Sequence, residues 1–179
     1  MRRTTHDRVL KLPYRGAPQT VGVIGQAALA AQGDYSVREL SEIICAGLPS
    51  KDYVGEYQAF YYFMLGPHVR YMRDPRTVEL VRDPTLIARK ILAGEVVSLD
   101  CDDMDAFLAA MVLSVGGQVQ SVTVAFRHMF HEGNRQFSHV FCEARDPVTG
   151  LYVVLDPVAG RNTKQMLRRA VAATKWPIA

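Results

Sequence analysis

The period of the hydrophobic pattern changes near Gly116. Before this point apolar residues recur every three or four positions, which predicts helices, and after it apolar and polar residues alternate, which predicts strands. Helices first and strands later predict an α+β fold. We expect an antiparallel sheet that packs against the last helix before the change.

The N-terminal part of the chain, about residues 1–98, is predicted to be mainly helical. Helices are predicted at 19–31, from a capping box at Ser36–Glu39 onward, at 53–64 after the N-cap Asp52, and at about 84–93 after the N-cap Asp83. A short strand is predicted within 7–14, and Val69–Pro75 is predicted to be extended. The segment Glu79–Pro84 is interpreted as turn and capping chemistry.

The strongest helical pattern covers 101–115. Its apolar residues share one face, and they are Met104, Phe107, Leu108, Met111, Val112 and Val115. Asp100 is the expected N-cap. Cys101 would therefore begin the helix, at a spacing from Met104 and Leu108 that turns its side chain toward the packed face.

The rest of the chain is predicted to form strands and one final helix. Alternating positions indicate three strands, around Val122–Phe126, Phe137–Phe141 and Leu151–Leu155. The turn residues Asp146–Gly150 predict a hairpin between the last two strands. A tail helix is predicted from about Thr163 to Ala173.

Composition limits the possible classes of function. The 179 residues, 49% hydrophobic and 22% charged, are typical of a globular domain. A net charge of +3 with scattered basic residues predicts no nucleic-acid partner, and the lack of a long apolar run predicts no membrane partner. Three widely spaced cysteines form no disulfide framework or CxxC pair, which favours a reducing compartment. No cofactor is predicted.

The beginning of the chain loosely mimics a signal peptide. Basic residues precede the apolar run Val21–Ala30. The pattern is broken by Pro13, Tyr14, Arg15 and Gln26. We therefore predict a cytoplasmic location.

Three residues supply the groups for thiol chemistry. Cys101, His139 and Asp156, in this chain order, are a nucleophile, a base and a group that orients the base. At a helix N-terminus the helix dipole favours the reactive thiolate of Cys101. Taken singly, each residue has a simpler explanation: Cys101 as a small buried hydrophobe, His139 as a core histidine, and Asp156 as a turn former before Pro157.

The carboxylates around Cys101 allow a second interpretation, a metal site. Four carboxylates surround the thiol, and they are Asp100, Asp102, Asp103 and Asp105. Negative charges at a helix N-terminus interact favourably with the helix dipole, but they also raise the pKa of the thiol. A calcium loop is excluded because Met104 occupies the third ligand position.

A zinc site made of His128, His131, His139 and Cys142 has unsuitable spacing, and Cys142 should point to the opposite sheet face from His139. No metal is predicted. His128 and His131 are placed in a polar loop, Arg127–Gln136, that could gate a substrate cleft.

Three short motifs resemble the transglutaminase-like superfamily of bacteria and phages, which includes papain-type peptidases, deamidases and acyl transferases. They are Leu99–Asp103, Ser138–Phe141 and Val154–Pro157. The resemblance implies one domain over 1–179, with a papain-like catalytic core at about 99–160 and a C-terminal helix or tail at about 161–179. It also implies Cys101 as nucleophile, His139 as base, Asp156 as the residue that orients the base, and a structural role for Asp103.

The sequence departs from the superfamily at two positions. Many members have glycine where this chain has Leu99, and an aromatic residue where it has Met104. No oxyanion donor is evident from the sequence, and the backbone N–H of Cys101 is the default candidate.

Three functions remain open. The first is a hydrolytic peptidase or deamidase that acts on a protein or peptide through a thioester. The second is an interaction protein of a phage particle that keeps the fold with little turnover, in which case other phage structural proteins would be partners and the particle its location. The third and weakest is a metal-dependent hydrolase that uses His128, His131 and Cys142.

Overall fold

The computed structural model describes residues 8–11, 17–73, 78–126 and 139–178. Its helices are α1 (Ala17–Ala31), α2 (Tyr35–Ile44), α3 (Tyr53–Met64), α4 (Pro84–Leu92), α5 (Cys101–Ser114), the short 3-10 turn η2 (Gly160–Asn162) and α6 (Thr163–Arg169). Its strands are β1 (Arg8–Lys11), β2 (Val69–Tyr71), β3 (Val78–Val81), β4 (Val97–Leu99), β5 (Gln118–Phe126), β6 (His139–Arg145), β7 (Tyr152–Leu155) and β8 (Ala170–Pro177). The predicted α+β class is confirmed.

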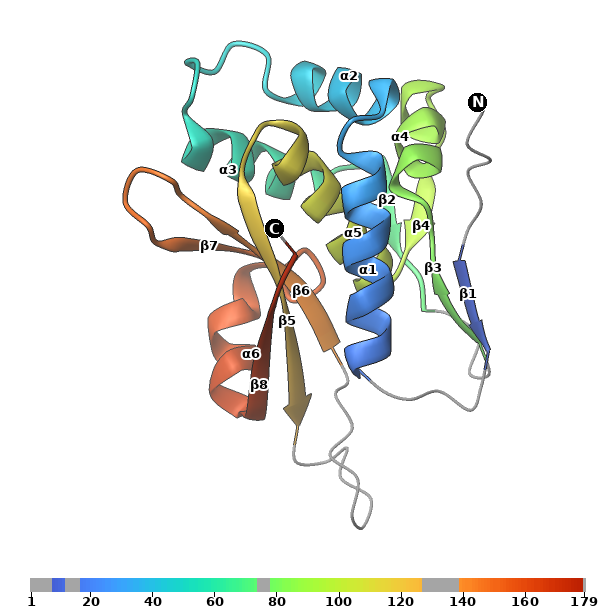
Figure 1. The fold of residues 1–179 in the computed structure, drawn as a ribbon, viewed down its shortest axis with the longest axis vertical. Helices are drawn as coiled ribbons and strands as arrows, with labels where there is room; N and C mark the ends of the chain where they lie inside the picture. The colour runs from blue at the N-terminus through green and yellow to red at the C-terminus, as the bar shows by residue number, and fades with distance from the viewer. Residues whose placement is uncertain (1–7, 12–16, 74–77, 127–138, 179) are drawn as a thin grey trace.

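The main sheet has four antiparallel strands in the order β7-β6-β5-β8 (Figure 1). Two smaller sheets each have two strands: β1 pairs antiparallel with β3, and β2 pairs parallel with β4. The β2–β4 pair matters for the site, because β4 leads directly into α5. The backbone N–H of Met72 donates to the carbonyl of Leu99 at 2.9 Å, which holds the end of β2 beside the start of α5.

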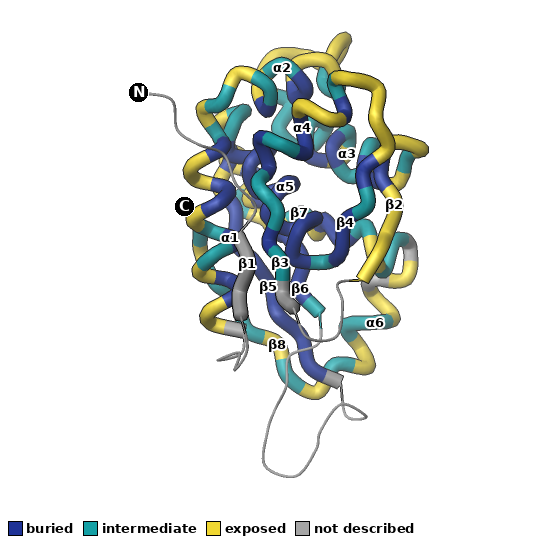
Figure 2. Tube along the Cα trace, turned by 90° about the vertical axis from the view of Figure 1, so that its right-hand side faces the viewer, coloured by how far each residue is buried: buried dark blue, intermediate teal, exposed yellow. Residues whose placement is uncertain are grey.

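Helix α5 is the centre of the core. Every residue from Asp102 to Leu113 is buried, as the dark tube in Figure 2 shows. The helix packs against α1 and against strands β5 and β6 (Figure 1). The side chains that surround it include Tyr57 and Phe60 of α3, Val119 of β5 and Cys142 of β6. Since burial of apolar surface is the main stabilising contribution to folding, α5 is held firmly on the sheet.

The other face of the sheet is covered by α6. Val122 and Val124 of β5 and Phe141 of β6 form a separate apolar cluster with Met166 and Leu167. This division follows the alternation of side chains along each strand. Helix α5 and helix α6 thus enclose the sheet from its two sides.

Three predictions of local structure are wrong. Helix α2 begins one residue before Ser36, with Asp34 rather than Ser36 as its N-cap, and Oδ1 of Asp34 accepts from the N–H of Ser36 at 2.9 Å. Both residue types cap well, so the sequence left two choices. In the segment Glu79–Pro84 the expected capping by Asp83 is confirmed, but the expected turn is strand β3, which pairs with a strand far away in the chain. Pairing of this kind depends on tertiary structure.

The third correction concerns the tail. The predicted helix over Thr163–Ala173 ends at Arg169, and the chain continues as strand β8 along the edge of β5. The backbone of β5 offers a row of hydrogen-bonding groups that β8 satisfies. The indole N–H of Trp176 also donates to the hydroxyl of Thr123 at 3.0 Å, and Lys175 Nζ lies 2.8 Å from Glu143 Oε2. Residues 170–177 of the expected C-terminal helix or tail are therefore part of the sheet.

The remaining helices agree with the sequence to within two residues at each end that was predicted. Helices α3 and α4 have the expected N-caps, Asp52 and Asp83, which accept from the backbone N–H groups of Gly55 and Thr85. The apolar run that mimics a signal peptide lies within α1, which packs on α5. Among the described residues, no helix has both the length and the apolar character needed to cross a membrane.

Candidate active site

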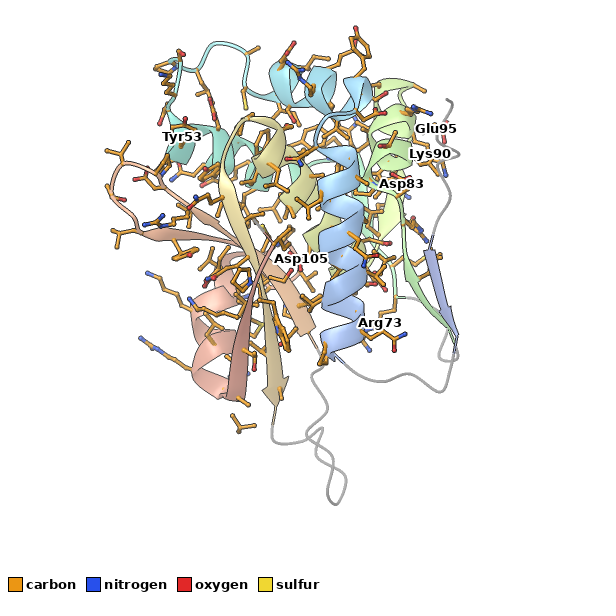
Figure 3. All side chains as sticks on the ribbon, in the orientation of Figure 1. Tyr53, Arg73, Asp83, Lys90, Glu95 and Asp105 are labelled. Atoms are coloured by element: carbon orange, nitrogen blue, oxygen red, sulfur yellow. The ribbon has the colours of Figure 1, made fainter. Side chains whose placement is uncertain are left out.

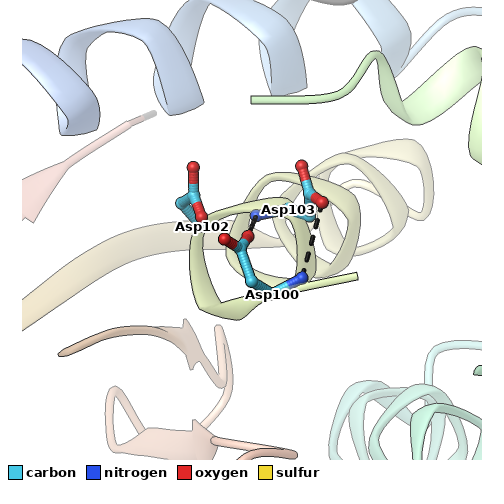
Figure 4. A group of neighbouring side chains, drawn as sticks. All are labelled: Asp100, Asp102 and Asp103. Carbon is cyan, nitrogen blue, oxygen red and sulfur yellow. Dashed lines mark hydrogen bonds between the residues drawn. The ribbon is translucent and has the colours of Figure 1, made fainter. Parts of the chain in front are cut away.

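The N-terminus of α5 is built by a reciprocal cap. The N–H of Asp103 donates to Asp100 Oδ1 at 3.5 Å, and the N–H of Asp100 donates to Asp103 Oδ2 at 3.4 Å (Figure 4). Asp103 also accepts from the backbone N–H of Arg82 at 2.7 Å and lies 3.5 Å from its guanidinium. Because these bonds satisfy otherwise unpaired donors, the cap fixes where Cys101 begins the helix.

The two carboxylates of this cap and the carboxylate of Asp102 lie close enough together to be compared with a metal site. One oxygen from each of Asp100, Asp102 and Asp103 lies within 4.8 Å of the others. Both oxygens of Asp103, however, already accept hydrogen bonds, and burial raises the pKa of its carboxyl to about 7, with Asp100 adding to the rise and Arg82 opposing it. Asp100 and Asp103 therefore serve as the cap of α5.

Strands β6 and β7 bring two of the predicted site residues into contact. His139 begins β6, and its Nε2 lies 3.1 Å from both carboxylate oxygens of Asp156, which follows the last residue of β7. Asp156 is fully buried, and its Oδ1 also accepts from the N–H of Ala159 at 3.1 Å. An ionised carboxylate can only accept, so the tautomer that fits this contact carries its hydrogen on Nε2 and leaves Nδ1 of His139 to take up a proton.

The contact also shows that Asp156 has two roles. It forms the turn that was its simpler explanation, since its backbone carbonyl accepts from the N–H of Gly160 at 3.0 Å. Its side chain at the same time holds His139. The imidazole of His139 is stacked on Phe141, with ring centroids 5.8 Å apart, and its side chain is only 9% exposed. These contacts fix the orientation of the ring.

Cys101 is half-buried at the first position of α5. It packs against an apolar cluster that includes Val140, the neighbour of His139 in β6, and Ala106 of its own helix. Asp105 lies four residues after Cys101, on the same face of α5. It is close enough to Asp156 for the charge of Asp156 to raise the pKa of Asp105. Helix α5 therefore places Cys101 beside Val140 of β6 and Asp105 near Asp156.

Two residues beside Cys101 were not recognised from the sequence. Tyr71 ends β2 directly opposite Leu99, and Arg73 follows on the surface (Figure 3). Burial raises the pKa of the Tyr71 hydroxyl, the hydrogen bond with Arg73 lowers it, and a charge on Cys101 raises it. Their nearness to Cys101 depends on the parallel pairing of β2 with β4, for which the sequence holds no local signal.

The other two cysteines have different surroundings. Burial raises the pKa of Cys45 to about 11, and Glu56 adds to the rise. Burial likewise raises the pKa of Cys142 well above its ordinary value, with Asp105 and Glu143 contributing. Neither thiol is expected to ionise near neutral pH. His128, His131 and the loop Arg127–Gln136 lie outside the described residues, as does Phe137.

A surface hollow of about 640 Å³ lies elsewhere, on the outer side of α2. It is lined by Gly33, Tyr35, Arg38, Glu39, Glu42, Ile43 and Ala46. None of these residues belongs to the region of Cys101, His139 and Asp156. The hollow is therefore not the candidate active site.

Comparison with known proteins gives one distant structural relative. No protein-family model and no curated protein matches the sequence. Among solved structures, the crystal structure of a putative protease from Parabacteroides distasonis is similar, with a TM-score of 0.53 and 14% sequence identity. The similarity covers 83% of this chain and 28% of the other. It shows a shared fold, and the chain spans less than a third of the length of that relative.

Proposed function

We propose that this protein is a transglutaminase-like thiol enzyme that hydrolyses peptide or carboxamide bonds. The observation that carries the proposal is the contact between His139 and the fully buried Asp156. A buried carboxylate that accepts from an imidazole holds the ring in one tautomer and stabilises its protonated form. The half-buried Cys101 at the N-terminus of α5 supplies the candidate nucleophile.

In the proposed reaction, Nδ1 of His139 takes the proton of the Cys101 thiol, and the thiolate attacks the carbonyl carbon of the substrate. The carbonyl oxygen becomes an oxyanion, for which the backbone N–H of Cys101 is a candidate donor. Collapse of this intermediate breaks the C–N bond, and His139 returns the proton to the leaving amine or ammonia.

The thioester that remains is then attacked by water. His139 takes a proton from the water, the C–S bond breaks, and the thiol is regenerated with release of a carboxylic acid. With a peptide bond the enzyme would be a peptidase, and with a side-chain carboxamide a deamidase. Attack by an amine in place of water would give cross-linking.

The structural relative is described as a putative protease, and it supports the proposal only at the level of the fold because the two sequences are 14% identical. The identity of the substrate and the roles of the three residues rest on the geometry and on the motif resemblance. A protein or peptide is the expected partner.

The test is the rate of alkylation by iodoacetamide between pH 4 and pH 9, read by mass spectrometry for each cysteine. Cys101 should be labelled quickly well below the ordinary thiol pKa of about 8.5. Cys45 and Cys142 serve as internal controls, because their raised pKa values predict slow labelling throughout. A Cys101 that reacts no faster than Cys45 contradicts the proposal and favours the phage-particle interaction protein.

The variant Cys101→Ala connects labelling to turnover. It should abolish hydrolysis of peptide and carboxamide substrates and leave the circular dichroism spectrum unchanged, since alanine is a good helix former at an N-terminal position of a helix. Cys45→Ala is the matched control and should retain full activity. Hydrolysis that persists in Cys101→Ala contradicts the assignment of the nucleophile.

A further inference from the structure

Asp105 is a fully buried carboxyl on α5 with no partner to satisfy it. Neither of its oxygens has a hydrogen-bond partner among the described residues, and the same is true of the hydroxyl of Ser121 on β5. Ser121 lies close enough to favour the ionised form of Asp105, although their geometry is not that of a hydrogen bond. Buried polar groups without partners are rare in folded proteins, so the position requires an explanation.

Figure 3 shows where Asp105 lies in the fold. The groups that act on it come from the sheet and are Asp156 after β7, Cys142 on β6 and Ser121 on β5. Cys142 is neutral near pH 7, because burial raises its pKa well above the ordinary value. Helix α1, which packs on α5, has no charged residue. Asp156 is therefore the charged group that acts on Asp105 from these elements.

The two carboxyls have unequal surroundings. Asp156 accepts from His139 and from the N–H of Ala159, and both bonds favour its charged form. Asp105 has no such donor. Burial raises the pKa of Asp105 to about 7, and the charge of Asp156 adds to the rise. Because the charge of Asp156 acts on Asp105, the two carboxyls do not ionise independently, and the proton of the pair belongs to Asp105.

We propose that Asp105 is a positioning residue whose proton decides how much negative charge lies behind His139. The role in catalysis rests on the proposed function. While Asp105 is neutral, Asp156 alone stabilises the protonated imidazole. When Asp105 loses its proton, a second negative charge favours imidazolium at His139 and disfavours thiolate at Cys101, four residues away on the same helix face. Asp105 thereby couples the alkaline side of the pH profile to a group outside the His139–Asp156 contact.

The test is an NMR titration of the His139 imidazole between pH 5 and pH 9 in the wild-type protein and in Asp105→Asn. Asparagine keeps the shape of the side chain and removes its charge. The titration midpoint of His139 should move to lower pH in the variant. We expect the proton affinity of the imidazole to fall by about three- to tenfold, because one nearby negative charge is removed. An unchanged midpoint in a folded Asp105→Asn protein overturns the proposal.

Glu143→Gln is the matched control. It makes the same change from carboxyl to amide at a buried position on a different element, strand β6. There Gln120 and Lys175 already bind the side chain of Glu143. The midpoint of His139 should move much less in this variant than in Asp105→Asn. A shift of equal size in both variants would also overturn the proposal, because it would show a general effect of buried charge.

A second measurement needs no Asp105 variant and remains valid if Asp105→Asn fails to fold. The carboxyl carbon of Asp105 should titrate near pH 7 in the wild-type protein and at lower pH in Asp156→Asn, where the like charge is absent. A wild-type Asp105 that titrates below pH 5 overturns the proposal. Both titrations are independent of turnover, so an unreactive Cys101 would contradict the proposed enzyme without changing the result for Asp105.

Discussion

His139 Nε2 lies 3.1 Å from each carboxylate oxygen of Asp156, although the two residues are not opposite one another in the sheet. Strand pairing sets Cys142 opposite Leu155, so Asp156 follows the last paired residue of β7 and reaches diagonally toward the beginning of β6. The contact therefore depends on the register of two strands. A shift of one residue would turn the side chains of a strand to the opposite face and remove the contact.

Replacing Asp156 with asparagine should slow hydrolysis by more than about tenfold and leave residual activity, because the imidazole would keep a neighbour but lose its correct tautomer and its stabilising charge. Steady-state kinetics at several pH values measure the effect. Asp34→Asn is the control, since Asp34 caps helix α2, which contributes no residue to the candidate site, and asparagine caps a helix as well as aspartate does. Full activity of Asp156→Asn would assign the orienting role to another residue.

Arg73 should attract negatively charged reagents to Cys101. Its guanidinium is exposed and hydrogen-bonded to Tyr71. A charge on Cys101 is close enough to contribute to the raised pKa of Arg73. Arg73→Gln should therefore lower the ratio of the iodoacetate rate to the iodoacetamide rate at Cys101, most clearly at low ionic strength.

The matched control for this prediction is Arg70→Gln, which removes the exposed arginine within β2. Its ratio should stay near that of the wild-type protein. Equal ratios in wild type and Arg73→Gln would show that Arg73 does not act on reagents at Cys101.

The cap of α5 should be needed for both stability and thiol reactivity. Asp103→Ala removes the side-chain half of the capping box and the bond to the backbone of Arg82. We expect a loss of about 1–2 kcal/mol in the free energy of unfolding and slower alkylation of Cys101. Urea denaturation and the labelling assay measure the two effects. A variant as stable and as reactive as the wild type would show that the cap does not position Cys101.

Stability should depend on pH through Asp105. Its pKa is raised from 3.8 in the unfolded chain to about 7 in the fold, so the folded state binds more protons between these values. The contribution of this group to the free energy of unfolding therefore falls as pH rises from about 4 to 7, by up to about 4 kcal/mol. Asp105→Asn should lack this decline. Urea denaturation of both proteins at pH 4, 5.5 and 7 tests it, and parallel curves would contradict the raised pKa.

Much of the local structure is determined by the sequence alone. The apolar face that begins at Met104 makes α5 a helix, and Asp52, Asp83 and Asp100 mark where their helices begin. These signals can be recognised because caps and helical periodicity act between residues that are close in the chain. The α+β class follows from the order of the patterns.

Only the tertiary structure decided which distant segments meet. Strand β3 exists because β1 pairs with it, and the last residues become β8 because β5 has an open edge. Tyr71 reaches the surroundings of Cys101 through the parallel β2–β4 pair. The buried position of Asp105 beside Asp156 likewise depends on how α5 lies on the sheet. Backbone pairing and burial act between residues far apart in the chain, and no local pattern encodes their partners.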